Sequence, residues 1–186
     1  MNYHNITKKD MNNGKGFRVV LWVAGCDHNC EGCHNKETHN PDGGIPFDEN
    51  ALNEIFEELE DKYVAGITFS GGDPLHKNNV EEINKIIDII KEKYPDKNIW
   101  IYSGYTYDYL KKSTNLLDIL RREIVEKCDV FVDGRFVLSL RDTSLPWKGS
   151  SNQIVWDMNT KTPIVDDVPV YDEDYEKNYA ETCDNC

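Results

Sequence analysis

Three cysteines, Cys26, Cys30 and Cys33, stand close together in the chain in a C-x3-C-x2-C pattern. This spacing allows three thiolates to converge on one small inorganic centre. A structural zinc ion is held by four protein ligands, and here the fourth would have to come from a nearby histidine or from distant cysteines. An iron–sulfur cluster with one iron left open needs no fourth protein ligand. The spacing therefore favours a [4Fe–4S] cluster, and structural zinc is the alternative.

A glycine-rich turn follows an apolar segment further along the chain, at Gly71, Gly72, Asp73 and Pro74. Paired glycines permit unusual backbone angles and a close approach of a ligand to the backbone, and Pro74 stiffens the turn. Exposed carbonyl oxygens in such a turn are suitable acceptors for an ammonium group. The turn is therefore a candidate binding site for a small ligand, and an ordinary strand-to-helix connection is the alternative.

Single polar residues follow two later apolar segments. Ser103 can face the same ligand as the glycine turn, Arg135 can offer its guanidinium to a carboxylate, and Asp133 can hold a polar group or a monovalent cation. A capped turn and a surface ion pair are the alternatives for these residues. His76 is expected at the surface, whereas Cys128 is expected in the core as a small apolar side chain.

The segments that carry these residues alternate between apolar strands and amphipathic helices. We predict strands at residues 17–24, 66–70, 98–102, 128–132 and 151–156, and helices at 49–62, 80–93 and 116–127, the first of them capped by Asp48. The alternation indicates an α/β fold with βαβ units, a parallel sheet and flanking helices. An eight-fold barrel takes about 250 residues, so the 186-residue chain predicts an incomplete barrel or an open sheet. The reactive loops are then expected at the carboxyl ends of the strands.

Acidic side chains outnumber basic ones, 34 to 21, which gives a formal net charge of −13. This excess argues against nucleic-acid binding through phosphate neutralisation and against docking on anionic membranes. No segment approaches the roughly 20 apolar residues that span a bilayer, and the N-terminal segment lacks the apolar core of a secretory signal. We therefore expect a cytoplasmic protein whose thiols stay reduced.

We predict one domain over residues 1–165 and an acidic tail over residues 166–186. The tail is expected to be solvated or to dock on a basic partner. It ends with Cys183 and Cys186 in a Cys-x-x-Cys pattern. Such a pair is typical of a redox centre or of half a metal site, and an incidental pair in a frayed tail is the alternative.

The segment WVAGCDHNCEGCHNKETHN around the three cysteines closely resembles the cluster loop of radical S-adenosylmethionine (SAM) activating enzymes for glycyl-radical proteins. The resemblance implies that Cys26, Cys30 and Cys33 hold a [4Fe–4S] cluster whose fourth iron is chelated by SAM. The glycine turn resembles the GGEP-type motif whose backbone holds the SAM amino group, so a branched residue at Gly72 is expected to weaken SAM binding and to spare the cluster. Gly32 departs from the usual aromatic residue before the third cysteine, which leaves the adenine contacts open.

Three further stretches, GGDPLHKNN at 71–79, CDVFVDGRF at 128–136 and LPWKGSSNQ at 145–153, resemble the family of activating proteins of anaerobic (class III) ribonucleoside-triphosphate reductase, in which a glycine at position 32 is normal. The resemblance runs from about residue 12 to 157. It implies an incomplete (βα) barrel of the radical SAM type. It also implies a reaction in which the reduced cluster passes one electron to SAM. SAM then cleaves to methionine and a 5′-deoxyadenosyl radical, which removes a hydrogen atom from a glycine of the reductase.

The implied partners are the large subunit of the reductase and an electron donor such as flavodoxin or ferredoxin. Two rival functions stay open at this point. One is a radical SAM enzyme that acts on a small molecule, for which no separate substrate anchors are recognisable in the sequence. The other is a zinc-binding module without catalysis, which would contain no iron.

Overall fold

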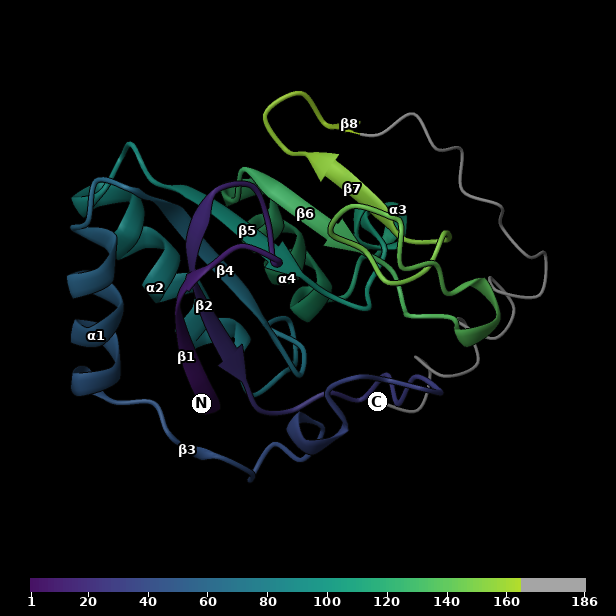
Figure 1. Cartoon of the computed structure of the whole chain (residues 1–186). Helices are drawn as coiled ribbons and strands as arrows, with labels where there is room; N and C mark the ends of the chain where they lie inside the picture. Colours follow the sequence, from purple (N-terminus) through teal and green to yellow (C-terminus); the bar gives the residue numbers. More distant parts are fainter. Residues whose placement is uncertain (165–186) are drawn as a thin grey trace.

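The computed structural model describes residues 1–164, which form a sheet of eight strands with flanking helices (Figure 1). The strands lie in the order β3-β1-β2-β4-β5-β6-β7-β8. Their bounds are β1 Asn2–Asp10, β2 Phe17–Val23, β3 Ile45–Pro46, β4 Val64–Gly71, β5 Asn98–Tyr102, β6 Val130–Asp133, β7 Ile154–Asp157 and β8 Thr162–Pro163. The helices are α1 Glu49–Leu59, α2 Val80–Lys93, α3 Tyr107–Lys112 and α4 Leu116–Lys127, with 3-10 turns η1 at Lys36–Thr38 and η2 at Leu138–Leu140. The predicted acidic tail, with its Cys-x-x-Cys pair, lies outside the described residues.

Parallel pairing is confined to the middle of the sheet. Strands β2, β4, β5 and β6 run parallel to their neighbours in this group, whereas β1, β3, β7 and β8 join the sheet antiparallel. The prediction of a parallel sheet is therefore right for the centre and wrong for both sides. The described sheet is mixed, and it is open because β3 and β8 at its two ends do not pair with each other. It is not a closed barrel.

Strand β1 is the largest element that the sequence patterns missed. Its sequence, NYHNITKKD, is polar, and only two of its residues are fully buried. A short turn with Gly14 and Gly16 at positive φ joins it to β2. Short turns connect antiparallel neighbours, since a parallel crossover needs a dozen or more residues. The antiparallel pairing of β1 with β2 therefore follows from the short turn between them, although no apolar run predicted that β1 is a strand.

The large hydrophobic core lies between the helices and one face of the sheet. Alternate residues of the parallel strands, such as Leu21, Phe69 and Ile101, belong to one buried cluster with the apolar stripes of α1, α2 and α4. These three helices were predicted, and Asp48 caps α1 by accepting a hydrogen bond from the Ala51 backbone N–H at 3.0 Å. Helix α3, with six residues, is too short to show a period. None of the helices within residues 1–164 is long and apolar enough to cross a membrane.

Cys128 is the C-cap residue that follows α4, and β6 begins later than predicted, at Val130. The backbone N–H of Cys128 donates to the carbonyl of Val125, so helical pairing continues as far as this residue. The Cys128 side chain is 3% exposed, and its thiol donates to the carbonyl of Ile124 at 3.3 Å. The prediction of a buried, structural Cys128 is confirmed.

The opposite face of the sheet carries a second, smaller hydrophobic cluster, which contains Trp100 and three valines. Arg18 is fully buried beside it and donates to the Thr68 hydroxyl at 2.7 Å, while its guanidinium carbon lies 5.1 Å from the centre of the Trp100 ring. Trp147 packs edge-on against Trp100, with ring centres 5.1 Å apart. The central strands are therefore buried on both faces, which explains their near-continuous apolar runs.

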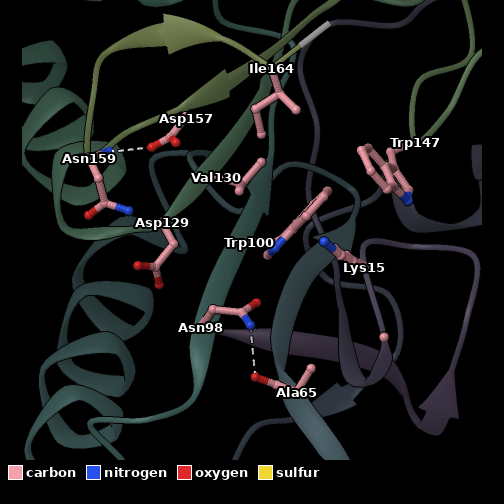
Figure 2. Close-up of a pocket in the computed structure, with 11 residues that line it drawn as sticks. Lys15, Ala65, Asn98, Trp100, Asp129, Val130, Trp147, Asp157, Asn159 and Ile164 are labelled. Carbon is pink, nitrogen blue, oxygen red and sulfur yellow. Dashed lines mark hydrogen bonds between the residues drawn. The ribbon is translucent and has the colours of Figure 1, made fainter.

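A cavity of ≈ 580 Å³ opens on this second face (Figure 2). Trp100 and Trp147 line it together with residues from the amino ends of the parallel strands, among them Asn98 and Val130. The amino and carboxyl ends of parallel strands lie at opposite edges of a sheet. The cavity is therefore remote from the loops that carry the predicted site residues, and the candidate site has to be built at the other edge.

Candidate functional site

The predicted site residues lie on four loops at one edge of the sheet. Strands β2, β4, β5 and β6 are successive parallel neighbours, so the loops that follow them start at the same edge. The cysteine loop (residues 25–39) follows β2, and the GGDP turn (residues 71–74) ends β4. Ser103 follows β5, Asp133 ends β6, and Arg135 comes shortly after it. The expectation that these motifs share the carboxyl edge of the strands is confirmed.

Backbone hydrogen bonds fasten the two ends of the cysteine loop. The Gly25 N–H donates to the Thr38 carbonyl at 2.7 Å, and the Cys26 N–H donates to the His39 carbonyl at 3.0 Å. The loop is therefore closed on itself. A further bond, from the Asp73 N–H to the Gly25 carbonyl at 2.7 Å, ties the start of the loop to the GGDP turn.

The three predicted ligands, Cys26, Cys30 and Cys33, are free thiols that are each partly buried. The Cys33 sulfur accepts a hydrogen bond at 3.4 Å from the backbone N–H two residues further along the chain. The backbone N–H of His28 acts to lower the pKa of Cys26, and the backbone N–H of Phe136 acts to lower the pKa of Cys30. Such donors stabilise thiolates and tune the reduction potential of an iron–sulfur cluster. The three side chains therefore fit the ligand set of a cluster.

Burial raises the pKa of the Cys26 thiol to about 12. Burial also raises the pKa of Cys30, although the Arg135 charge acts in the opposite direction. Both thiols are therefore protonated at neutral pH without a metal, and cluster binding has to release these protons. Among residues 1–164, no three His, Cys, Asp or Glu side chains lie close enough together to hold a single metal ion. A four-iron cluster is larger than one ion, and its sulfur ligands stand farther apart.

The Asp73 carboxylate joins three of the four loops. It is 1% exposed and accepts hydrogen bonds from His28 Nε2 at 2.6 Å and from Ser103 Oγ at 2.9 Å. The carboxylate also accepts hydrogen bonds from the backbone N–H groups of Gly104 at 3.2 Å and Leu75 at 2.7 Å. Burial alone would raise the pKa of this carboxyl, but the His28 bond and the other donors hold it below its usual value. The carboxylate is therefore a fixed negative charge whose bonds go to protein groups.

The two glycines of the GGDP turn allow its backbone to touch the backbone of neighbouring segments. Gly71 has φ +107°, and a Cβ on it would lie 2.6 Å from the Val23 nitrogen. A Cβ on Gly72 would lie 2.5 Å from the Gly25 carbonyl oxygen and 2.8 Å from that of Thr38. The close approach is therefore made by β2 at Gly71 and by the cysteine loop at Gly72. Pro74 is buried, and ligand binding by the carbonyls of this turn stays a prediction.

Arg135 and Asp133 are two residues apart and have different surroundings. The Arg135 guanidinium donates to the His28 carbonyl and interacts with the Cys30 thiol, so it ties the loop after β6 to the cysteine loop. The Asp133 carboxylate is 2% exposed, and its bonds go to the Tyr107 and Ile154 backbone N–H groups and to the indole N–H of a tryptophan on β7. These bonds hold α3 and β7 against the end of β6. A ligand role for either side chain stays a prediction.

The folded protein is expected to lose stability through Asp133 as the pH rises from about 4 to 6. Burial raises the pKa of this carboxyl from 3.8 to about 6, so the folded state binds the proton more tightly than the unfolded state does. The stability that protonated Asp133 contributes is complete below pH 4 and is lost as the pH rises past 6. A pKa difference of two units corresponds to about 3 kcal/mol in the free energy of unfolding. The measurement is the free energy of unfolding against pH for the wild type and for Asp133→Asn, which does not titrate at this position. Parallel curves between pH 4 and 7 would contradict the assignment.

Two histidines near the site were missed or misplaced by sequence reasoning. His28 was considered only as one of the nearby histidines that could complete a zinc site, and it instead provides the shortest bond to Asp73. His76, expected at the surface, is 3% exposed, and its Nε2 lies 3.2 Å from the Asp27 carboxylate of the cysteine loop. Their positions within the cysteine loop and within GGDPLHKNN were the available signals.

The glycine before the third cysteine has a structural explanation. Gly32 has φ +70°, and a Cβ on it would lie 2.9 Å from a methyl carbon of Leu138 in η2. A side chain at this position would therefore meet both backbone strain and a steric conflict. Leu138 is 43% exposed and occupies the space into which an aromatic residue would extend.

Comparison with known proteins gives consistent results across this region. A family model described as a 4Fe-4S single cluster domain matches residues 12–156, which include the cysteine loop. The chain is 42% identical over 157 residues to a protein of Escherichia coli strain K12, which covers 83% of this chain and 97% of the relative. A protein of Pasteurella multocida is 40% identical over 158 residues (84% and 97%), and one of Enterobacteria phage T4 is 40% identical over 156 residues (84% and 94%). All three are named anaerobic ribonucleoside-triphosphate reductase-activating protein.

Proposed function

The chain belongs to the family of anaerobic ribonucleoside-triphosphate reductase-activating proteins and has a 4Fe–4S domain, and we propose that it activates such a reductase as a radical SAM enzyme. The observation that carries the proposal is the contact between the cysteine loop and the GGDP turn. A cluster ligand set and a candidate SAM-binding turn are bonded to each other at one edge of the sheet. A zinc-binding module without catalysis would not need the GGDP turn.

In the proposed site, Cys26, Cys30 and Cys33 hold the [4Fe–4S] cluster. When bound, the cluster supplies the electron for reductive cleavage of SAM, which leads to loss of a hydrogen atom from a glycine of the reductase and leaves a glycyl radical there. The carbonyl oxygens of the GGDP turn accept the SAM ammonium group. Arg135, whose guanidinium bonds to the cysteine loop, offers a donor for the SAM carboxylate.

The remaining proposed residues have supporting roles. Ser103 donates to Asp73, which keeps the GGDP turn and the loop after β5 together. Asp133, with its bonds to α3 and β7, holds the base of the loop that carries Arg135. Because these groups are buried and bonded to protein, they exclude water around the reacting species and protect the radical from wrong partners.

We also propose that β2, β4, β5 and β6 with their helices are the incomplete barrel of the radical SAM type, within a domain of residues 1–165. Such a short barrel has an open side that is wide enough for a loop of the reductase. The electron donor would be a protein such as flavodoxin or ferredoxin. The cytoplasm is the proposed location because its reducing conditions keep the cysteines available as ligands.

The deciding experiment combines the reduced protein, SAM and a class III reductase without oxygen and records the electron paramagnetic resonance spectrum. We expect the doublet of a glycyl radical on the reductase, and we expect no doublet with the Cys26→Ala variant. SAM cleavage without a radical on the reductase would instead support a small-molecule substrate. A colourless protein that binds zinc and takes up no iron would contradict the proposal altogether.

A further inference from the structure

His28 stands between two cluster cysteines, and its ring points into the protein. Its side chain is 10% exposed, and its Nε2 lies 2.6 Å from the Asp73 carboxylate. His34, a residue of the same type on the same loop, is exposed. His28 therefore differs from the exposed His34, and also from the half-buried His39 at the end of the loop, whose Nε2 lies 3.3 Å from the Cys33 sulfur.

The ring of His28 lies in a fitted space. A Cβ on Gly104 would overlap the imidazole, so the absence of a side chain there makes room for the ring. The Tyr105 ring packs edge-on against the imidazole, with ring centres 4.7 Å apart. The Tyr105 ring is itself in contact with the Arg121 guanidinium, which lies 4.2 Å from the ring centre. Two neighbours, Gly104 and Tyr105, and the charged acceptor Asp73 thus fix one orientation of the His28 side chain.

The main chain of His28 is also held, because its carbonyl accepts a hydrogen bond from the Arg135 guanidinium. The ends of the cysteine loop are secured by backbone bonds at Gly25 and Cys26. Between Cys26 and Cys30, the ring bond to Asp73 and the carbonyl bond from Arg135 both act on His28. This residue therefore joins the middle of the loop to the rest of the site.

We propose that His28 is a positioning residue, and that its bond to Asp73 is a latch that holds the middle of the cysteine loop against the GGDP turn. The latch fixes the position of the cluster relative to the turn that binds SAM. This part of the inference rests on the proposed function. Asp73 is suited to this role because it also accepts from Ser103 and Gly104. One buried carboxylate thereby holds three loops in fixed positions relative to one another.

The test compares His28→Leu, His28→Gln and the matched control His34→Leu in the full-length, cluster-loaded protein. His28→Leu removes a hydrogen bond to a charged group, and we expect it to weaken SAM binding roughly tenfold or more, as measured by calorimetry. Hydrogen exchange of the backbone from residues 26 to 35 should become faster as well. Gln places an amide N–H at a reach similar to that of His Nε2, so His28→Gln should stay within about threefold of the wild type. His34→Leu should behave as the wild type.

Wild-type SAM affinity and wild-type exchange in His28→Leu would overturn the latch. If His28→Leu does not fold or bind iron, Gly104→Ala tests the same point, because it keeps the histidine and leaves no space for its ring. Unchanged exchange and affinity in that variant would likewise overturn the proposal. A wild-type protein that binds the cluster and no SAM would contradict the proposed function, and the exchange measurement would still decide whether the latch exists.

Discussion

Alanine in place of Cys26, Cys30 or Cys33 is expected to abolish binding of the [4Fe–4S] cluster, whereas Cys128→Ala retains the full iron content. The first three thiols share one loop, in which backbone N–H groups favour their thiolate forms. Cys128 follows α4 in the hydrophobic core, where its thiol donates to a helix carbonyl. A cluster with only two protein ligands loses the chelation that holds it.

The measurement is the iron and sulfide content after anaerobic reconstitution, together with the visible absorption band of the cluster. Thermal unfolding of each variant without the cluster serves as a control that the fold is intact. Full iron content in the Cys30→Ala variant would show that the ligand assignment is wrong. Loss of iron in Cys128→Ala with an intact fold would do the same, since it would place a ligand in the core.

The second large effect is expected for Gly72→Val, which should lower both cluster retention and SAM affinity. The sequence alone predicted an effect on SAM binding with the cluster spared. The structure changes this expectation, because a Cβ on Gly72 would lie 2.5 Å from the Gly25 carbonyl oxygen at the start of the cysteine loop. Overpacking of this kind costs about 1–3 kcal/mol, and here the backbone that has to move carries the ligands.

Iron content, SAM calorimetry and the thermal midpoint of Gly72→Val check this prediction. Gly149→Val is the matched control, because a Cβ there would lie 3.1 Å from the Phe136 ring, a side chain that can adjust. The expected result is a loss of cluster and SAM binding in Gly72→Val and near wild-type values in Gly149→Val. A Gly72→Val protein with full iron content and weakened SAM binding would restore the simpler expectation from the sequence.

The sequence by itself determined the parts of the protein that depend on local spacing. The C-x3-C-x2-C pattern placed three thiols on one loop, and the apolar periods of α1, α2 and α4 predicted these helices close to their observed bounds. The rule that parallel strands share a carboxyl edge predicted from the sequence that the cysteine loop and the GGDP turn lie at the same edge. The first two inferences use only residues that are near one another in the chain, and the third adds a general rule of parallel sheets.

Only the tertiary structure decided which way individual side chains and edge strands point. His28 and His34 lie on one loop, yet one is bonded to Asp73 inside the protein and the other is exposed. His76 is buried against Asp27, and β1 is a strand in spite of its polar sequence. The physical reason is that the environment of these groups comes from segments that are distant in the chain. Hydrogen-bond partners such as Asp73, 45 positions after His28, exist only once the sheet has brought the loops together.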